Sequence, residues 1–435
     1  MSEVRRANNL ETLDLSYLDD SQAEVVASSA NNVLIRAAAG SGKTKTLMAA
    51  IAKHRYDHLN DRICAITYTR AARAEMETRL KEMGIYDIEV TTIHVWARNL
   101  LNDFAWKYDF KVSILEEAQI KEILRKLVKE YLLRAPKIRS INLEILYSFI
   151  TGNKTMDISS NYKRTLIALE SRYIKYKREN QLYDFTDYPL YLYHVMLAYN
   201  EYVNNIDALF VDEFQDVDET QFKIFERVIA QKKLFIGDGW QSIFVFRGAD
   251  GAVFEKLDFF EQHKLKYNYR SYQEIINYAC EVYLKYKDRL DDSQYYISRI
   301  AYDELIPTSK IICARGTGGL VTIVSPWGDF SSSADADEDG IYSGLKLSET
   351  FKDFMDRKPM ILCRTNKQVK AINEKGYYNV STVHQAKGLE YDNVIVIDFP
   401  IKELEDLNIA YVALTRARNG LYVINWALFE ELMDA

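Results

Sequence analysis

The stretch NVLIRAAAGSGKTKTL (32–47) constrains the fold of this chain more than any other part of its sequence. It places an apolar run, a loop of small residues and a helix-forming segment in direct succession, which is typical of a strand, a turn and a helix. In the loop AAAGSGKT (37–44), Gly40 and Gly42 allow the backbone to curl so that its N–H groups converge. The sequence therefore predicts a phosphate-binding loop at the start of a helix whose dipole favours an anion.

The residues that follow the glycines supply what a nucleotide phosphate needs. Lys43 is placed to reach the β- and γ-phosphates, and the Thr44 hydroxyl is placed to ligate Mg²⁺. The first position of the usual pattern is glycine, and here it is Ala37. The prediction rests on the loop together with the strand before it and the helix after it.

A second metal ligand is expected from LFVDEFQD (209–216). Asp212 follows an apolar run and can hold the metal through water, whereas Glu213 can polarise the water that attacks the γ-phosphate. Taken alone, these residues would also fit an acidic helix start. Together with the phosphate loop they predict a site for ATP and Mg²⁺, with Thr44 and Asp212 as the protein ligands of the metal.

Short apolar runs alternate with helical patterns in two parts of the chain, and each part predicts a parallel sheet covered by helices. A charged, helix-periodic segment between about 111 and 180 interrupts the first part, so we expect a helical insertion there. The acidic segment 331–340 is expected to be a loop. The predicted fold class is α/β, with strands near 32–36, 63–67, 208–211, 234–236, 311–314, 320–325, 360–363, 393–397 and 421–425.

The charge of the chain is unevenly distributed. The formal net charge is −7, yet residues 111–180 contain 15 Lys and Arg against 8 Asp and Glu, a local excess of +7. A basic segment of this kind can hold nucleic acid while the acidic remainder limits indiscriminate binding. A solvated helical face is the simpler alternative.

The cysteines and the N-terminus indicate the compartment. Four scattered cysteines form no CxxC pair, which predicts neither a disulfide framework nor a zinc site and fits a reducing environment. The polar N-terminus lacks the apolar core of a signal peptide. No run approaches the ~18 apolar residues of a membrane span. We therefore expect a cytoplasmic protein with no membrane segment.

Ten ordered segments of the chain resemble the motifs of superfamily 1A helicases of the UvrD/Rep/PcrA type. The segment 183–188 resembles the LDFDD element of that family, and 361–366 resembles the arginine strand of its second lobe. The other matches, in family order, are LDDSQAEVV (18–26, Q motif), ITYTRAARAEM (66–76, Ia), TTIHVWA (91–97, Ib), VDEFQDVDETQ (211–221, II), IGDGWQSIFVFRGAD (236–250, III), LKYNYRS (265–271, IV), STVHQAKGLEYDNVIVI (381–397, V) and YVALTRARNGLYVI (411–424, VI).

The resemblance implies two RecA-like lobes and movement along single-stranded DNA driven by ATP, in the 3′-to-5′ direction. Its domains would be residues 1–105, the first part of lobe 1A; 106–184, the helical insertion 1B; 185–262, the second part of lobe 1A; and 263–435, lobe 2A.

The resemblance also implies a catalytic set. Gln241 would contact the γ-phosphate or the attacking water. Arg270 and Arg416 belong to the second lobe, so they would reach the γ-phosphate only when the cleft closes, where a guanidinium stabilises charge on the transferring group. The complete implied set is Lys43, Asp212, Glu213, Gln241, Arg270 and Arg416.

The nucleotide itself would be bound by residues of both lobes. Gln22 would read the adenine edge, Lys45 and Tyr269 would lie on the two faces of the ring, and Glu390 would meet the ribose. The full implied set is Gln22, Ala39, Gly40, Ser41, Gly42, Lys43, Thr44, Lys45, Tyr269 and Glu390.

For the DNA strand the resemblance implies a mixture of rings, hydroxyls and basic groups. Aromatic rings give sequence-tolerant stacking of about 1–3 kcal/mol per base. Phe246 stands where the family usually has tryptophan, so weaker stacking is expected there, and His94 and His384 have a structural alternative. The implied set is Tyr68, Thr69, Thr92, His94, Phe185, Phe244, Phe246, Arg247 and His384.

The chain departs from the family pattern in several places. Full-length relatives carry a mobile 2B domain before motif V, but Asn366 and Thr382 are only about fifteen residues apart here. The sequence also ends soon after motif VI, so no C-terminal nuclease is expected. Motif III reads GDGWQ where many members read GDDDQ, and Gly239 and Trp240 therefore change the loop before Gln241.

Three functions remain open at the level of sequence. The first is a compact translocase or helicase on single-stranded or tailed DNA. The second is a DNA-sensing regulatory subunit that switches a protein partner such as a nuclease, as compact UvrD-like proteins do in antiviral systems such as Gabija, or that works with a loading factor. The third is the same motor with RNA as its track.

Overall fold

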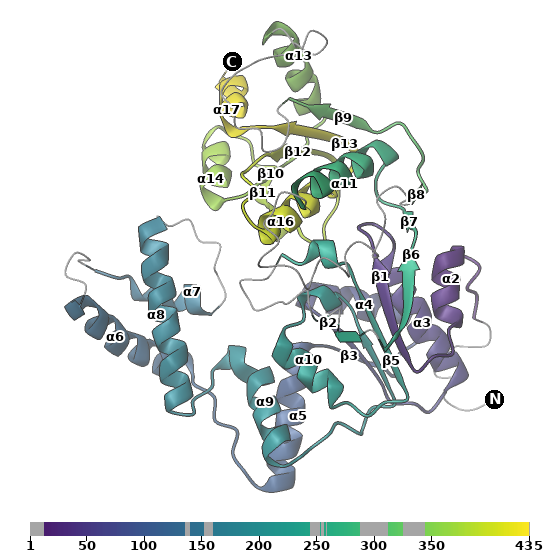
Figure 1. Ribbon diagram of the computed structural model, residues 1–435, viewed down its shortest axis with the longest axis vertical. Coiled ribbons are helices and arrows are strands. Elements are labelled where there is room, and N and C mark those ends of the chain that lie inside the picture. The colour runs from purple at the N-terminus through teal and green to yellow at the C-terminus, as the bar shows by residue number, and fades with distance from the viewer. Residues whose placement is uncertain are drawn as a thin grey trace.

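Two parallel sheets, one above the other, form the cores of two lobes, and a group of helices projects from the side of the lower lobe (Figure 1). The computed structural model describes residues 13–134, 140–151, 160–243, 253, 256–257, 259–287, 312–324 and 344–434. The arrangement confirms the predicted α/β class with two parallel-sheet lobes.

The first lobe is built on a six-stranded sheet in the order β3-β2-β4-β5-β1-β6. All of its strand pairs are parallel. Its strands are β1 (Asn32–Ala37), β2 (Ile63–Thr67), β3 (Glu89–Thr92), β4 (Ala208–Val211), β5 (Lys232–Gly237) and β6 (Glu261–Leu265).

Helices cover both faces of this sheet because successive strand residues point to opposite sides. Val33 and Ile35 pack with Leu47 of α3, whereas Leu34 packs with Trp96 of α5 on the other face. The helices of this lobe are α2 (Asp20–Ala27), α3 (Lys43–Asp57), α4 (Arg70–Glu82), α5 (Ile93–Tyr108), α9 (Tyr188–Ala198) and α10 (Glu219–Glu226).

The charged segment folds as the expected helical insertion. It contains α6 (Glu117–Arg134), α7 (Leu143–Ile150) and α8 (Ser160–Glu179), which stand apart from both sheets (Figure 1). Their inward faces form a separate hydrophobic cluster that includes Leu124 and Phe149. The basic side chains are therefore carried on a small unit with its own core.

The second lobe is built on a five-stranded parallel sheet in the order β11-β10-β12-β13-β9. Its strands are β9 (Leu320–Ile323), β10 (Met360–Cys363), β11 (Val380–Thr382), β12 (Tyr391–Ile397) and β13 (Ala417–Ile424). Its helices are α11 (Gln273–Lys287), α13 (Gly344–Met355), α14 (Asn366–Glu374), α15 (Val383–Ala386), α16 (Leu404–Leu414) and α17 (Trp426–Asp434). A separate pair, β7 (Tyr267–Asn268) with β8 (Ile312–Cys313), lies at the junction with the first lobe.

The structure adds detail that the pattern did not predict. Strands β3, β6, β7 and β11 were not expected, and the expected boundary after residue 262 falls inside β6. This strand pairs with β1 as far as Leu265 opposite Ala37, so the first sheet continues to Leu265. The expected loop 331–340 lies outside the described residues. Within the described part of the chain, no helix combines the length and the apolar character needed to span a membrane.

Candidate active site between the lobes

The phosphate loop connects β1 to α3 and has the predicted curled backbone. Gly40 and Gly42 have φ values of 70° and 79°, a left-handed conformation that side-chain-bearing residues rarely adopt. A Cβ atom on Gly42 would lie 2.8 Å from Nε2 of Gln22. Gln22 is buried and donates from Nε2 to the carbonyl of Ser41 at 3.1 Å, so α2 supports the loop from behind.

Two adjacent carboxylates follow β4, beside the start of α3. Thr44 donates from Oγ1 to Oδ2 of Asp212 at 3.3 Å, so the two predicted metal ligands lie together. Burial, with the neighbouring charge of Glu213, raises the pKa of Asp212 to about 7. Burial acts on Glu213 in the same direction, but the positive charges of Lys43 and Lys387 bring the pKa of Glu213 below its ordinary value.

These oxygen groups suit Mg²⁺. A hydroxyl and a carboxylate are hard ligands, and Mg²⁺ is commonly held by one or two carboxylates together with substrate phosphates. A divalent cation there would also relieve the crowding of negative charge at Asp212. Among the residues that the structure describes, no group of three or more His, Cys, Asp or Glu side chains is arranged to hold a metal without such phosphates.

Gln241 is one of the points where side chains of the two lobes meet. It is buried in a short 3₁₀ turn, and its Nε2 donates to Oδ2 of Asp238 at 2.6 Å. Arg416, from the second lobe, donates from Nη2 to Oε1 of Gln241 at 3.2 Å and is itself buried. Burial and the neighbouring Arg270 lower the pKa of Arg416 to about 9. Two close guanidinium groups form a cationic centre suited to an anion.

Arg270 lies directly over the phosphate loop. A Cβ atom on Gly40 would lie 2.7 Å from the Cβ of Arg270, and the Gly40 carbonyl accepts a hydrogen bond from the backbone of Tyr269 at 2.8 Å. Asn268 donates from Nδ2 to the carbonyl of Ala39 at 2.6 Å. The backbone of the second lobe is therefore fastened to the loop itself, and the structure brings both predicted arginines to this end of the site.

The expected adenine-binding pair lies at the outer end of the loop. Lys45 has its Nζ atom 5.7 Å from the centre of the Tyr269 ring and 4.9 Å from that of Tyr17. The Tyr269 hydroxyl donates to Asp19, which also caps α2. Tyr17 was not predicted, because a tyrosine just before the Q motif carries no distinguishing spacing.

Glu390 lies with the arginines. Its Oε2 accepts from Nε of Arg270 at 2.8 Å, and its Oε1 lies 3.7 Å from Nη1 of Arg418. The side chain that was expected to meet a ribose thus also anchors a predicted arginine finger.

A buried ion pair between the lobes was also missed. Lys387 of the second lobe donates from Nζ to both carboxylate oxygens of Asp216, at 2.8 and 2.6 Å, and to the carbonyl of Gln241 at 2.9 Å. Burial raises the pKa of Asp216 to about 6, although Lys387 opposes this. Both residues lie within motifs II and V, but no spacing argument indicated that they meet.

The described members of the predicted DNA-binding set follow the ends of strands or lie beside them. Tyr68 and Thr69 follow β2, and Thr92 ends β3. The rings of His94 and Phe185 are stacked at 6.1 Å with an interplanar angle of 14°. Thr69 also caps α4 by accepting from the backbone of Ala72, so it has a structural role as well.

The remaining members are divided between the second lobe and an undescribed segment. His384 lies on α15 of the second lobe. Phe244, Phe246 and Arg247 lie outside the described residues.

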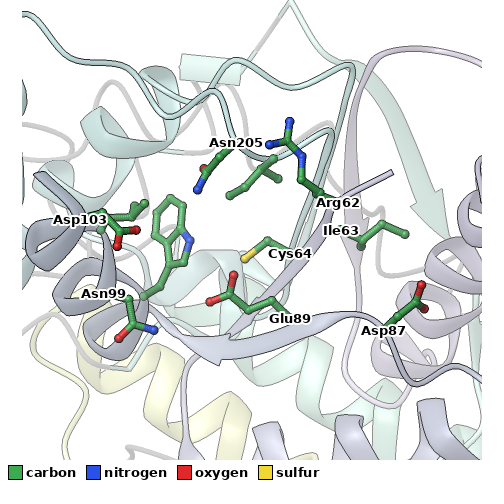
Figure 2. A pocket seen from close by; sticks show the side chains of 11 residues that line it. Arg62, Ile63, Cys64, Asp87, Glu89, Asn99, Asp103 and Asn205 are labelled. Atoms are coloured by element: carbon green, nitrogen blue, oxygen red, sulfur yellow. The ribbon is translucent and has the colours of Figure 1, made fainter. Parts of the chain in front are cut away.

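A pocket of about 400 Å³ lies at the end of the first sheet away from the phosphate loop, where β2 and β3 begin. Glu89 points into it from β3, with Asn99 and Asp103 of α5 on one side (Figure 2). Burial, with the charge of Asp103, raises the pKa of Glu89. None of the predicted site residues lines this pocket, so it is separate from the site between the lobes.

The two parallel-sheet lobes, the glycine loop, the paired carboxylates and the arginines of the second lobe define the class of the protein: a two-lobed P-loop fold with a candidate nucleotide site between the lobes. The family model of the UvrD/REP helicase N-terminal domain matches residues 18–260, and that of the UvrD-like helicase C-terminal domain matches residues 357–427. The first match alone covers more than half of the chain. The chain belongs to the UvrD-like helicase family, which confirms the resemblance inferred from its motifs.

Curated relatives carry helicase names. The chain is 25% identical to a protein of Mycoplasma pneumoniae named as a probable DNA helicase, over 94% of this chain and 84% of that protein. It is 29% identical to DNA helicase II of Haemophilus influenzae, over 63% of this chain and 41% of the relative. It is 27% identical to the ATP-dependent DNA helicase PcrA of Staphylococcus aureus, over 62% of this chain and 40% of the relative. The matches to the last two therefore span about two fifths of those proteins.

Proposed function

We propose that this chain hydrolyses ATP between its lobes and couples each turnover to movement along single-stranded DNA, as a translocase or helicase that travels 3′ to 5′. The observation that carries the proposal is the contact between Arg416 and Gln241, which joins the second lobe to the hydrolysis site of the first at 3.2 Å. Its family membership and the names of its relatives support the use of ATP and DNA.

In this mechanism the first lobe holds the triphosphate and the second completes the site. The loop backbone and Lys43 bind the phosphates, and Glu213, whose pKa is lowered, accepts the proton of the attacking water. Arg270 and Arg416 stabilise the charge that develops on the transferring group. When bound at Thr44 and Asp212, Mg²⁺ would neutralise phosphate charge. Gln22, Lys45, Tyr269 and Glu390 would orient the base and ribose.

On the DNA side, the proposed contacts divide between the lobes. Tyr68, Thr92, His94 and Phe185 belong to the first lobe, and His384 belongs to the second. A change in the separation of the lobes would therefore move one set of contacts relative to the other. Ring stacking tolerates any base sequence, which a motor that advances along DNA requires. We place this activity in the cytoplasm, on single-stranded or tailed DNA.

The test is ATP hydrolysis with and without single-stranded oligonucleotides. We expect strong stimulation by DNA that falls as salt rises, because phosphate contacts are lost. Lys43→Ala should abolish hydrolysis and leave DNA binding largely intact. Lys53→Ala is the matched control, because Lys53 lies on the same helix and forms an exposed pair with Asp57. Hydrolysis that persists in Lys43→Ala would remove the assignment of the phosphate loop.

A second candidate function is favoured by the short path between β10 and β11 of the second lobe. Helix α14 ends at Glu374 and β11 begins at Val380, which leaves no room for a domain such as 2B. The chain would then act as a DNA-sensing regulatory ATPase for a protein partner such as a nuclease. Stimulated hydrolysis without strand separation on 3′- or 5′-tailed duplexes, together with a co-purifying protein, would favour this function. RNA oligonucleotides of equal length test the remaining alternative track.

A further inference from the structure

Trp240 belongs to the first lobe by its place in the chain, yet its side chain packs within the core of the second lobe. The indole is stacked on the ring of Tyr283 of α11, with centroids 4.3 Å apart and an interplanar angle of 13°. It meets the ring of Tyr411 of α16 edge-on, at 5.2 Å and 89°. All three rings are buried. We call Trp240, Tyr283 and Tyr411 the aromatic clasp.

The residues just after Trp240 are bound to the second lobe as well. The carbonyl of Ser242 accepts from Nδ2 of Asn408 at 2.8 Å, and Oδ1 of Asn408 accepts from the Tyr283 hydroxyl at 3.1 Å. The carbonyl of Gln241 accepts from Lys387 at 2.9 Å. The segment 240–242, which we call the sensor loop, is therefore held by the second lobe on both sides of the Gln241 side chain.

The sensor loop is tied to the first lobe by fewer side chains. Asp238 accepts from the backbone of Trp240 at 3.1 Å and from the side chain of Gln241 at 2.6 Å. The Ser242 hydroxyl donates to the carbonyl of Gln215 at 3.1 Å. Because both lobes hold the same three residues, separation of the lobes would break one set of contacts or deform the loop between them.

We propose that Trp240 is a positioning residue for hydrolysis. The aromatic clasp holds the sensor loop against the second lobe, so Gln241 reaches its working position only while the lobes are together. Aromatic pairs stabilise a contact beyond the burial of their area and favour particular ring geometries, which makes the clasp a specific contact as well as an apolar one. The inference rests on the proposed function, because Trp240 acts on the reaction through Gln241.

The test compares variants on both sides of the clasp. Trp240→Leu and Tyr283→Leu remove the ring contact and keep an apolar side chain, whereas Trp240→Phe keeps a ring. Trp106→Leu is the control, because Trp106 is 89% exposed on α5. The measurements are kcat and KM for ATP with a saturating oligothymidylate, and the thermal midpoint of each variant.

Both leucine variants should lose about 10-fold or more in kcat, because a small displacement of a catalytic group is costly. KM for ATP should stay within about three-fold, since the binding loop is intact. Trp240→Phe should retain most of the activity, and Trp106→Leu should match the natural protein.

Wild-type kcat in both leucine variants would overturn the inference. The inference would also fail if Trp240→Phe lost as much kcat and as much thermal stability as the two leucine variants, because that result would indicate a purely structural role. If Trp240→Leu does not fold, Tyr283→Leu provides the same test from the other lobe. If the natural protein hydrolyses no ATP, the proposed function fails first, and that result is distinct from a failure of the clasp.

Discussion

At Gly40 the second lobe packs directly against the phosphate loop of the first. The space that a side chain would need there is filled by the Cβ of Arg270 at 2.7 Å and by Nδ2 of Asn268 at 2.8 Å. The glycine is therefore required twice, once for its positive φ and once for the approach of the second lobe.

Gly40→Ala should reduce kcat/KM for ATP by about 10-fold or more, because the added methyl group pushes Arg270 away and adds about 1–3 kcal/mol of backbone strain. Gly376→Ala is the matched control, since Gly376 has a φ of 86° but no atom within 4 Å of the added Cβ. Steady-state kinetics of both variants check the prediction. Equal activity in the two variants would show that the contact with Arg270 is unimportant.

At the residue scale, sequence reasoning found groups whose chemistry is tied to local spacing. Gly40, Lys43 and the pair at Asp212 lie in short motifs with strong backbone requirements. Asn268 and Tyr17 were not found, because their partners, Ala39 and Lys45, are set by how distant segments pack. The spacing of residues along the sequence carries no information about contacts of this kind.

A buried cluster of charged side chains joins α8 to the short turn that follows it. This turn carries Phe185, a proposed DNA contact. Lys177 donates to Asp184 at 2.7 Å and also to Asp187, and the Tyr173 hydroxyl donates to Asp184 at 2.9 Å. Burial opposes the ionisation of Asp184, but Lys177 holds its pKa below the ordinary value. The turn that carries Phe185 is thereby fixed to the helical insertion.

Lys177→Met should destabilise this region by about 3–5 kcal/mol, because it leaves buried carboxylates without their cation. Binding of single-stranded DNA should weaken as the Phe185 turn loses its support. Lys175→Met, two residues away, removes an exposed lysine that pairs loosely with Glu179 and should change stability by less than about 0.5 kcal/mol. Denaturant unfolding and oligonucleotide titration measure both effects. Equal stability of the two variants would contradict the prediction.

Sequence patterns predicted most elements but not all of their partners. Central strands such as β4, with four consecutive buried residues, are recognisable as apolar runs. Strand β6 alternates exposed and buried residues at the edge of its sheet, and β11 has only three residues, so neither gives a strong pattern. A strand that is very short or that alternates exposed and buried residues gives a weaker apolar run than a central strand, which is why the pattern missed these two.

For the whole molecule, the ion pair between Lys387 and Asp216 is a main polar contact across the lobes. The Asp216 side chain is buried and that of Lys387 is only 9% exposed, so Asp216 relies on this lysine to balance its charge away from water. The aromatic clasp and the contact of Asn268 with Ala39 lie at other points of the same interface. The lobes are thus joined by apolar, polar and ionic contacts around one site.

Lys387→Met should weaken the closed arrangement and reduce DNA-stimulated hydrolysis, since an unpaired Asp216 favours separation of the lobes. Adding Asp216→Asn removes the stranded charge, so the double variant should be less impaired than the single one. Lys370→Met, on an exposed face of α14, is the control. Small-angle scattering reports the separation, and kinetics report its effect. A double variant worse than the single one would contradict the prediction.

The short connection between the lobes has a mechanical consequence. Only Lys266 separates β6 from β7, and β6 is the edge strand farthest from β3 in the first sheet. Five strand spacings of about 4.8 Å put the β3 edge about 24 Å from this pivot. A rotation of about 10° about this pivot would displace the β3 edge by about 4 Å. That displacement is close to the rise of one nucleotide, which is about 3.4 Å per strand. Under the proposed function, a small rotation of the lobes beside the phosphates would thus become a displacement of about one nucleotide at the proposed DNA contacts.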